Sequence, residues 1–335
     1  MAIARRLPVV ATLPRSLYLE TTNRCDSKCQ TCIRTFRSLE PPADLTLAKV
    51  KTIAAQFPVL ERVVLHGIGE PLLNPEIFEI VGYLKLRAVT VLFNSDAISL
   101  TARRALRLIE SGLDEYRVSI DAATRQTYRA LRGVDQFDRV VANVRRLVDL
   151  EHERNRSTPR VSLWFTASRG NLHELPAFVR LAADLGVAEV YVQRLVFNGL
   201  GLATAENALH GHLQRQEEEL LARAEELAHE LDVALRASGL TTPLVSLQGE
   251  ATRPRPWAGC QRPWTLSYVT ANGNVLPCCI SPWVARDYRA LVLGNAFVES
   301  FADIWNGEGY RRFRINFESE SPPDPCRGCG LRWSI

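Results

Sequence analysis

The 335-residue sequence lacks the features that mark secreted and membrane proteins. No run of apolar residues approaches the length of about 18 that a membrane-spanning helix needs. The first six residues, MAIARR, lack the apolar stretch and the small-residue cleavage site of a signal peptide. We therefore expect a cytoplasmic protein with no membrane span.

A strong charge of either sign is also missing. Lysine and arginine number 41 and acidic residues 37, which gives a formal net charge of +4. So small an excess indicates no basic face, and we expect no nucleic-acid partner. The hydrophobic fraction of 46% and the charged fraction of 23% are typical of a globular protein that builds its own core.

Cysteine is present, but not at the density of a small disulfide-stabilised protein. Eight cysteines in a chain of this length are better explained as reduced thiolates that bind metal. Three of them, Cys25, Cys29 and Cys32, form a C-x3-C-x2-C loop directly after an apolar segment. Three such thiolates can hold three irons of a cubane cluster and leave the fourth iron without a protein ligand. A structural zinc site usually has four ligands and no fourth lies nearby, so the spacing favours iron–sulfur over zinc.

The last quarter of the chain carries a second group of cysteines: Cys260, Cys278, Cys279, Cys326 and Cys329. Apolar residues 266–270 and 275–276 flank Asn272-Gly273, the strongest short hairpin signal. Such a hairpin brings Cys260 and Cys278 together, and the C-x2-C pair at Cys326 and Cys329 completes a site of four thiolates. Structural zinc and a fully ligated iron–sulfur cluster both fit this set. Cys279 is left over, and we interpret it as a small buried residue rather than as an alternative ligand.

Strand-like and helical segments alternate along the first 200 residues. Strand patterns fall near residues 16–20, 61–66, 88–93, 115–120, 161–166 and 189–193. Helical patterns fall near 44–56, 74–85, 99–111, 136–151 and 173–185, the last with Asn171 as its expected N-cap. This alternation predicts an α/β fold with a parallel sheet, and six repeats suit a partial (β/α)6 TIM-like barrel. The active site of such a barrel lies at the carboxyl ends of its strands, where the first cysteine loop also falls.

The region after the barrel predicts a linker and a small second domain. Residues 206–237 have the pattern of one long amphipathic helix, which we expect to bridge the barrel and the cysteine-rich end. Pro254 and Pro256 mark the expected boundary. The predicted domains are the barrel at 1–205, the bridging helix and linker at 206–253, and a β-hairpin and helix domain at 254–335.

Three segments, in this order, resemble the radical S-adenosylmethionine (SAM) superfamily. The first is the strand and cysteine loop at residues 16–32. The second is Gly67-Ile68-Gly69-Glu70-Pro71 after the apolar strand 62–65, which is similar to the Gly-Gly-Glu-Pro element of the family. The third is RVSIDA at residues 117–122, which is similar to a fourth-strand segment that contacts SAM. The match covers residues 15 to about 200.

The resemblance implies that Cys25, Cys29 and Cys32 hold a [4Fe–4S] cluster whose open iron chelates SAM. Reductive cleavage of SAM then yields a 5′-deoxyadenosyl radical, and a low-potential electron donor such as flavodoxin or ferredoxin is an implied partner. The expected SAM-contacting residues are Gly67, Gly69, Glu70, Pro71, Asn94, Ser119 and Arg132. Glu70 suits the SAM ammonium group, whereas no residue identifies itself as a catalytic acid or base. Thr31 stands where the family often has an aromatic residue that packs the adenine.

The C-terminal cysteines resemble the SPASM extension of the superfamily, or its shortened twitch form. In that extension a cysteine precedes a hairpin, Gly-x4-Cys closes it, and a Cys-x2-Cys pair follows. Gly273 and Cys278 fit the middle element, and residues 304–314 resemble the helix after it. Because only residues 330–335 follow the last pair, we expect the short form. The resemblance then implies one auxiliary [4Fe–4S] cluster on Cys260, Cys278, Cys326 and Cys329.

Three functions stay open on this evidence. The first is a radical SAM oxidoreductase or related modifying enzyme for a small natural-product precursor such as a sugar or cyclitol, with the auxiliary cluster taking up an electron. The second is a peptide maturase with the same chemistry. The sequence shows no obvious additional peptide-binding module at its start, which favours the first. The third is a non-catalytic protein with two structural zinc sites.

Overall fold

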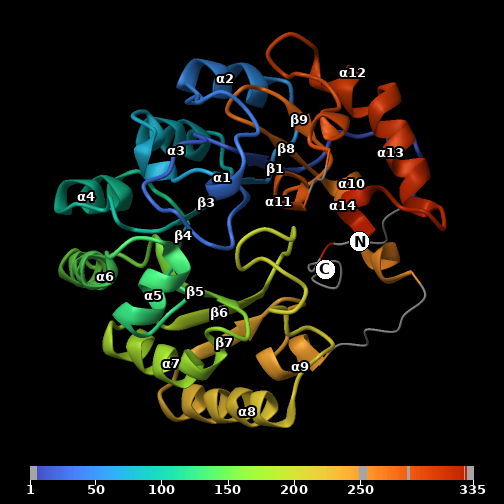
Figure 1. Ribbon diagram of the computed structural model, residues 1–335. Coiled ribbons are helices and arrows are strands. Elements are labelled where there is room, and N and C mark those ends of the chain that lie inside the picture. The colour runs from blue at the N-terminus through green and yellow to red at the C-terminus, as the bar shows by residue number, and fades with distance from the viewer. Residues whose placement is uncertain (1–5, 249–254, 285–286, 328, 330–335) are drawn as a thin grey trace.

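One curved sheet organises the molecule. The computed structural model describes residues 6–248, 255–284, 287–327 and 329. Its nine-stranded sheet has the order β7-β6-β5-β4-β3-β2-β1-β8-β9. Figure 1 shows the strands curving around the centre of the molecule with the longer helices outside them, as in an incomplete barrel. The predicted α/β partial barrel is therefore confirmed.

Apart from β7, the strands follow the predicted segments closely. They are β1 (Ser16–Leu19), β2 (Arg62–Val64), β3 (Thr90–Ser95), β4 (Glu115–Ser119), β5 (Arg160–Ala167), β6 (Glu189–Arg194), β7 (Ala234–Ala237), β8 (Leu266–Val269) and β9 (Val275–Leu276). Neighbours from β7 through β1 to β8 pair in parallel, and β8 and β9 form the predicted antiparallel hairpin.

Helices connect successive strands on the outside of the sheet. The barrel helices are α2 (Leu47–Ala55), α3 (Ile77–Leu86), α4 (Ala102–Glu110), α5 (Arg125–Arg132), α6 (Phe137–Glu153), α7 (Leu175–Asp184) and α8 (Arg215–Glu230). Shorter helices in this part are α1 (Ile33–Phe36), η1 (Pro71–Leu73), η2 (Leu172–Glu174) and α9 (Pro243–Gln248). The C-terminal part adds η3 (Pro256–Gly259), α10 (Arg262–Thr265), α11 (Ser281–Val284), η4 (Arg289–Leu291), α12 (Phe301–Trp305), α13 (Glu308–Glu318) and α14 (Asp324–Arg327). None of the helices in the described part of the chain has the length and apolarity needed to cross a membrane.

Alternation of side chains along the strands gives the sheet two different faces: an apolar face that packs under the outer helices, and a polar face that lines the inside of the barrel. In β4, Tyr116 and Val118 are fully buried, whereas Arg117 and Ser119 are only half-buried. Because successive side chains point to opposite faces of a strand, one set packs under the outer helices and the other faces the inside of the barrel. The apolar face stabilises the fold, and the polar face is free to build a site.

The structure corrects the prediction of one long helix at residues 206–237. Helix α8 covers only Arg215–Glu230, and β7 (Ala234–Ala237) follows it and pairs with β6 in parallel. Figure 1 shows α8 beside α7 on the outside of the sheet, so it extends the barrel and does not bridge to the cysteine-rich end. The predicted boundary at Pro254 lies outside the described residues.

A second correction concerns Asn171. It occupies the N-cap position of η2, but its side chain caps no helical N–H group. Its Nδ2 instead donates to the backbone oxygens of Asp121 and Thr166, at 2.9 and 3.0 Å. The side chain therefore ties the loop after β4 to the carboxyl end of β5.

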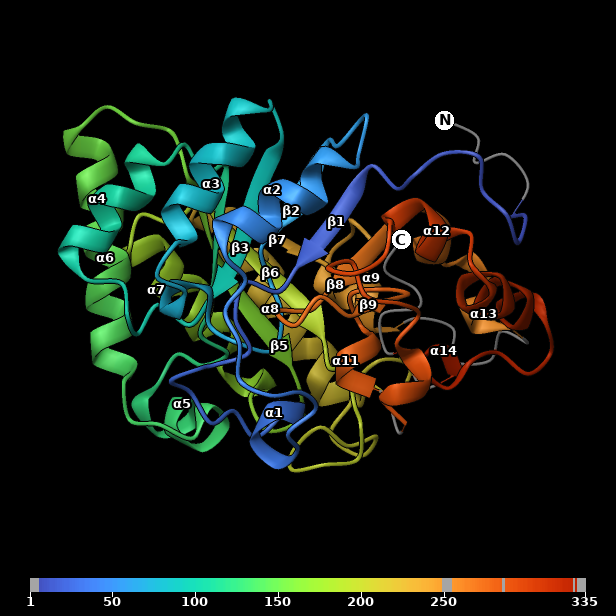
Figure 2. The same cartoon turned by 90° about the horizontal axis from the view of Figure 1, so that it is seen from above.

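The C-terminal hairpin is built into the barrel sheet. Strand β8 pairs with β1 in parallel over its full length. At the carboxyl end of β1, Glu20 accepts hydrogen bonds from the Ile68 N–H (2.9 Å), the Tyr268 hydroxyl (2.9 Å) and the Ala271 N–H (3.1 Å). One buried carboxylate thus joins the barrel to the hairpin, and burial raises the pKa of Glu20 to about 7. Figure 2 shows β8 and β9 next to β1, with α13 and α14 beyond them.

Candidate active site

The first cysteine loop lies between β1 and α1 and is held from its backbone. The N–H groups of Lys28 and Gln30 donate to the carbonyl oxygens of Arg132 and Leu131, at 3.1 and 2.7 Å. These carbonyls belong to the last turn of α5, which would otherwise leave them without helical partners. The loop is therefore held against the carboxyl end of α5.

The three thiols of this loop sit in a partly desolvated environment. Burial raises the pKa of Cys25 and Cys29, and raises the pKa of Cys32 to about 12. Carboxylates of Asp96 and Glu70 raise the pKa of Cys25 further. Without a metal these thiols stay protonated at neutral pH, whereas a bound metal deprotonates its thiol ligands. The donor set therefore suits a metal group and not a free thiolate nucleophile.

The Gly67-to-Pro71 segment packs directly on the cysteine loop. The Glu70 N–H donates to the Arg24 carbonyl oxygen at 2.8 Å. A Cβ atom at Gly69 would collide with the carbonyl oxygens of Thr22 and Arg24. A Cβ atom at Gly67 would meet the side chains of Glu20 and Tyr268. Both glycines are thus required by close approach, while Ile68 between them fills a buried position.

Glu70 is the centre of a buried hydrogen-bond network. Its Oε1 accepts from the Leu72 N–H (2.9 Å) and the Ser95 hydroxyl (2.7 Å), and its Oε2 accepts from the Asp96 N–H (2.8 Å). Burial raises the pKa of Glu70 well above its usual range, and the Asp96 carboxylate adds to that effect. A carboxylate has about four acceptor positions and these hydrogen bonds use three, so one acceptor position of this cavity-lining residue remains.

Asp96 connects this network to the first cysteine. Its carboxylate accepts from the Ser27 hydroxyl at 2.8 Å and lies 3.8 Å from the Cys25 sulfur. Burial raises the pKa of Asp96 to about 6, and the neighbouring Asp26 carboxylate contributes. Asn94 and Ser95 lie within β3, so the segment is a strand end and not the simple turn that its Asn-Ser-Asp sequence also suggests.

The loop after β4 supplies a buried ion pair on the other side of the cysteines. Asp121, in a left-handed backbone conformation, accepts from Arg132 Nη1 at 2.8 Å and from the Thr166 N–H at 2.7 Å. Arg132 is only 9% exposed, and its Nε has no hydrogen-bond partner among the described residues. Arg132 is therefore no surface residue, and it carries an unused donor.

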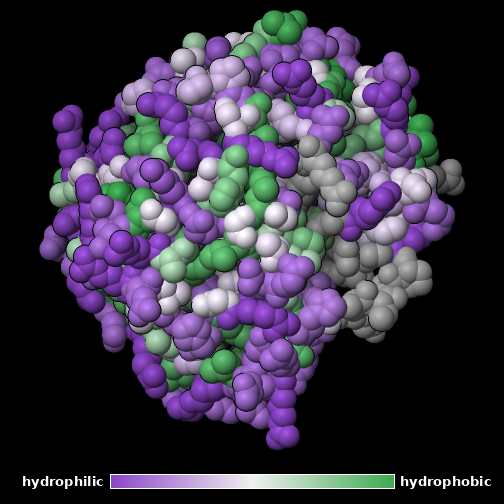
Figure 3. Space-filling view, in the orientation of Figure 1, coloured by the Kyte–Doolittle hydropathy of each residue, from purple (hydrophilic) through white to green (hydrophobic). Residues whose placement is uncertain are grey.

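One cavity of about 570 Å³ brings most of the predicted residues together. The sequence-predicted residues that line it are Cys25, Cys29, Cys32, Gly67, Gly69, Glu70, Asn94, Ser119 and Arg132. Thr31 lines it too, whereas Pro71 does not; Pro71 is the first residue of η1. The rim of the face drawn in Figure 3 is mostly hydrophilic, and more hydrophobic residues are exposed near its centre.

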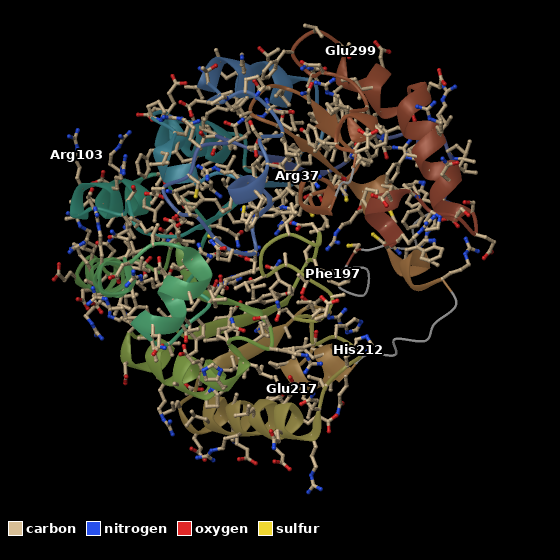
Figure 4. The ribbon with its side chains drawn as sticks, viewed as in Figure 1. Arg37, Arg103, Phe197, His212, Glu217 and Glu299 are labelled. Atoms are coloured by element: carbon tan, nitrogen blue, oxygen red, sulfur yellow. The ribbon has the colours of Figure 1, made fainter. Side chains whose placement is uncertain are left out.

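The loop between β6 and α8 crosses the mouth of this cavity. The Leu202 N–H donates to the Gln30 carbonyl oxygen at 2.7 Å, and Asn198 Nδ2 donates to the Trp283 carbonyl oxygen at 3.0 Å. This loop therefore contacts both the cysteine loop and the C-terminal part of the chain. Figure 4 places its residue Phe197 near the middle of the molecule.

The second cysteine group lies in a separate apolar cluster. Cys260, Cys278, Cys279, Cys326 and Cys329 pack there with aromatic residues that include Trp264, Tyr268, Phe313 and Phe317. Burial raises the pKa of Cys326 well above its usual range, and the nearby sulfurs of Cys278, Cys329 and Cys260 raise it further. The four cysteines that the sequence grouped together are therefore neighbours in space, although none of them lines the main cavity.

Cys279 separates the two sites. It is only 6% exposed, as predicted for a small buried residue, and it lines the main cavity beside Ile280 and Trp283. Its thiol forms a hydrogen bond with the Tyr18 hydroxyl, and burial raises its pKa to about 11. Residue 279 thus belongs to the wall between the cavity and the second cysteine group.

Several cavity residues escaped the sequence-based prediction. Asp96 had a usable signal, because it directly follows the end of β3, whereas Asp121 was included only as part of the segment 117–122 that resembles a SAM-contacting strand. Arg62, His66 and Trp164 had none, because they enter the cavity through strand alternation and the relative register of distant strands. The inward face of a strand is visible in the sequence, but the position of each residue along the barrel axis is not.

Two protein-family models match the chain. The radical SAM superfamily model matches residues 19–158, and the SPASM iron–sulfur cluster-binding domain model matches residues 260–330. The two matches contain the first and second cysteine groups respectively.

Individual relatives match over nearly the whole chain. The PqqA peptide cyclase of Streptomyces rochei is 26% identical over 326 residues, which cover 95% of this chain and 82% of the relative. The AdoMet-dependent heme synthase of Methanosarcina barkeri is 26% identical over 331 residues, covering 95% of this chain and 88% of the relative. Among solved structures, Streptococcus suis SuiB bound to S-adenosylmethionine is similar with a TM-score of 0.68 and 17% identity, over 97% of this chain and 72% of that chain.

Proposed function

This chain belongs to the radical SAM superfamily and carries a SPASM iron–sulfur domain, and we propose that it removes a hydrogen atom from a substrate bound in the barrel cavity. When bound, the [4Fe–4S] cluster and SAM supply the reductive C–S cleavage that generates a 5′-deoxyadenosyl radical. The observation that carries the proposal is the single cavity shared by the three loop cysteines and the strand-end residues of β2, β3 and β4.

We propose Cys25, Cys29 and Cys32 as the ligands of the SAM-binding cluster. Their loop is fixed through backbone hydrogen bonds to α5, and all three thiols face the cavity. Three protein ligands leave one iron of a cubane for SAM. A tetrahedral zinc site is a poorer fit, because Zn–S bonds of about 2.3 Å bring sulfurs to within about 4 Å of each other. Among the described residues, the only three candidate ligand atoms within 4.8 Å of one another are those of Cys25, Asp26 and Asp96.

SAM contacts are proposed for residues around this loop. Glu70 has a carboxylate position left for the SAM ammonium group, since its other contacts are internal. Arg132 has a free donor for the SAM carboxylate, and Asp121 holds the guanidinium in place. Asn94 and Ser119 offer neutral hydrogen bonds to the ribose, and Gly67 and Gly69 also line the cavity.

We propose Cys260, Cys278, Cys326 and Cys329 as the ligands of one auxiliary [4Fe–4S] cluster. Aromatic side chains pack around these cysteines and reduce their contact with water, which tunes the potential of such a cluster. When bound there, a fully ligated cluster supplies electron transfer and not substrate coordination. The wall at Cys279 and Trp283 keeps substrate away from it while leaving it near the cavity. A two-electron oxidation of the substrate fits this arrangement, with a low-potential donor such as flavodoxin or ferredoxin providing the electron for SAM cleavage.

The proposed substrate is a small organic molecule, such as a natural-product precursor. A cavity of about 570 Å³ must also hold SAM, so the remaining space suits a compact molecule or one side chain of a longer one. A peptide substrate is the second candidate, favoured by the similarity to a PqqA peptide cyclase. The similarity to a heme synthase favours the small-molecule class instead.

Anaerobic purification tests the proposal. We expect brown protein that contains iron and sulfide and that forms 5′-deoxyadenosine from SAM after reduction with dithionite. Colourless protein with two zinc ions per chain and no SAM cleavage would contradict it and support a structural scaffold. Transfer of deuterium from a labelled candidate into 5′-deoxyadenosine then separates small-molecule from peptide substrates.

A further inference from the structure

Arginine side chains gather in the part of the main cavity that lies away from the cysteine loop. Arg62 is the first residue of β2 and Arg117 is the middle residue of β4, and both line the cavity. The cysteine loop instead follows the carboxyl end of β1. In a parallel barrel the two ends of the strands lie at opposite sides, so these guanidinium groups sit deeper in the barrel than the proposed SAM site. The cavity is also lined by Arg160, Arg236 and Arg262. Glu189 is the acidic residue that lines the same part of it.

Three of these arginines line the same cavity as Tyr18 and lie within electrostatic range of its hydroxyl. Burial raises the pKa of Tyr18. The positive charges of Arg62, Arg262 and Arg117 act in the opposite direction and lower it. Three positive charges near one half-buried phenol repel each other, and a bound anion would reduce this repulsion. An anion in the cavity would therefore be favoured at this point.

The protein's own anions balance only part of this positive charge. Arg262 faces the sulfurs of Cys279, Cys260 and Cys329, so the second cysteine group engages its charge. Arg117 forms an ion pair with Glu115 at 2.6 Å. The Arg62 side chain forms no ion pair or hydrogen bond with any residue in the described part of the chain, although its backbone N–H donates to the Arg15 carbonyl oxygen at 3.2 Å. Its fork of donors is therefore available inside the cavity.

Two further features frame this arginine group. His66 lies beside it and stacks on Trp283 with ring centroids 6.2 Å apart, and its buried Nδ1 has no hydrogen-bond partner among the described residues. Burial lowers the pKa of His66 to about 4, so the ring is neutral and offers one donor and one acceptor. Trp164 stacks on Tyr191 at 4.2 Å and lies under the Arg117 guanidinium at 4.7 Å. The cations therefore stand next to aromatic surface that can pack against the carbon skeleton of a ligand.

We propose that Arg62 and Arg117, with the Tyr18 hydroxyl, bind a carboxylate or phosphate group of the substrate, which makes the substrate an organic acid and not a neutral sugar or cyclitol. Planar guanidinium groups bind both anions through paired, charge-assisted hydrogen bonds. The acid group would anchor the substrate at the deep end of the cavity and direct a carbon–hydrogen bond toward SAM. This inference rests on the proposed function, because it names the substrate class for that same cavity.

Direct binding measurements test the inference without turnover. Isothermal titration of anaerobic, cluster-loaded protein with SAM present uses three probes: benzene-1,3,5-tricarboxylate, phenyl phosphate, and the neutral benzene-1,3,5-tricarboxamide. We expect at least one anionic probe to bind about tenfold or more tightly than the triamide, and to weaken as salt rises. The stronger of the two anions identifies a carboxylate or a phosphate site.

Matched variants localise the binding. Arg62→Gln is the most specific of these variants, because it removes no described ion pair. We expect it to bind the preferred anionic probe about tenfold more weakly. Arg62→Lys keeps the charge but loses the paired donors, so it should weaken binding less. Arg103→Gln is the control, since Arg103 is exposed at the outer edge of α4, far from the cavity in Figure 4. Iron content and the visible spectrum show that each variant is equally loaded.

Two results would overturn the inference. One is equal affinity for the triamide and both anions; the other is a loss in Arg62→Gln no larger than that in Arg103→Gln. SAM cleavage by the unmodified protein is measured separately and tests the proposed function. A protein that cleaves SAM but does not prefer anions would therefore refute the substrate class alone.

Discussion

The two cysteine groups have similar chemistry but different surroundings. Burial raises the pKa of Cys25 and Cys32 in the first group and of Cys260 and Cys326 in the second. The N-terminal group has three cysteines on one short loop, and all of them face the main cavity. The C-terminal group has four, drawn from a hairpin and a later turn, and lies in an apolar cluster outside that cavity.

This contrast shows how one kind of ligand serves two tasks. A site that lines a cavity and lacks a fourth ligand can bind a second molecule, whereas a complete and enclosed site can only exchange electrons. The boundary between them is a thin wall that includes Cys279, whose thiol contacts Tyr18 on the cavity side. The proposed division of labour therefore follows from ligand number and exposure.

Removing the open group should have the largest effect. Replacement of Cys25, Cys29 and Cys32 together by alanine should abolish formation of 5′-deoxyadenosine, because no cluster remains to bind SAM. Chromatography of anaerobic, dithionite-reduced reactions measures this. Cleavage at the unmodified rate in the triple variant would show that the two groups had been assigned the wrong way round.

Removing the enclosed group should have a different and smaller effect. Cys326→Ala with Cys329→Ala should spare at least part of SAM cleavage but end product formation, with a loss of about four irons per chain. Cys279→Ala serves as the matched control for iron content, which should stay complete because this thiol is not a proposed ligand. Full turnover with the C-terminal site empty would reject its role in electron transfer.

The close packing around the open group predicts a backbone effect. In Gly69→Ala the new methyl group would meet the carbonyl oxygens of Thr22 and Arg24, so the segment must shift. We expect a loss of about 1–3 kcal/mol in stability and about tenfold weaker SAM binding, by thermal unfolding and titration. Gly82→Ala is the control, because a Cβ atom there meets open space in α3. That variant should be stabilised by about 0.5–1 kcal/mol, and equal behaviour of the two would refute the packing argument.

The Glu20 carboxylate, which joins the barrel to the C-terminal hairpin, predicts an effect that depends on pH. Burial raises the pKa of Glu20 from 4.5 to about 7, so the folded state favours its protonated form. Its stabilising contribution is complete below about pH 4.5 and is lost as the pH rises through 7. Between these limits the unmodified protein should lose about 3 kcal/mol more stability than Glu20→Gln. Unfolding curves at several pH values measure the difference, and parallel curves for the two proteins would contradict the prediction.

Local signals in the sequence predicted the six barrel strands, the hairpin and both cysteine groups. These features depend on short patterns such as strand alternation, Asn272-Gly273 and C-x2-C spacing. Strand β7 was missed because its sequence, Ala-Leu-Arg-Ala, consists of strong helix formers that pairing with β6 overrides.

The cavity itself was only partly predictable. Ser119 ends β4 and Glu70 lies in the loop after β2, and the sequence indicated both. The meeting of Arg62, Arg117 and Tyr18 depends on how three parallel strands are staggered, which no local pattern contains. The use of Asn171 as a link between loops, and not as a helix cap, has the same origin.

The central claim is that the cluster on Cys25, Cys29 and Cys32 keeps one iron open for SAM. Electron paramagnetic resonance of the reduced Cys326→Ala, Cys329→Ala protein tests it most directly, because only the N-terminal cluster should remain. The account predicts one cluster signal that changes when SAM is added, with coupling to ¹⁵N in the amino group of labelled SAM. A signal that stays unchanged at saturating SAM would contradict it.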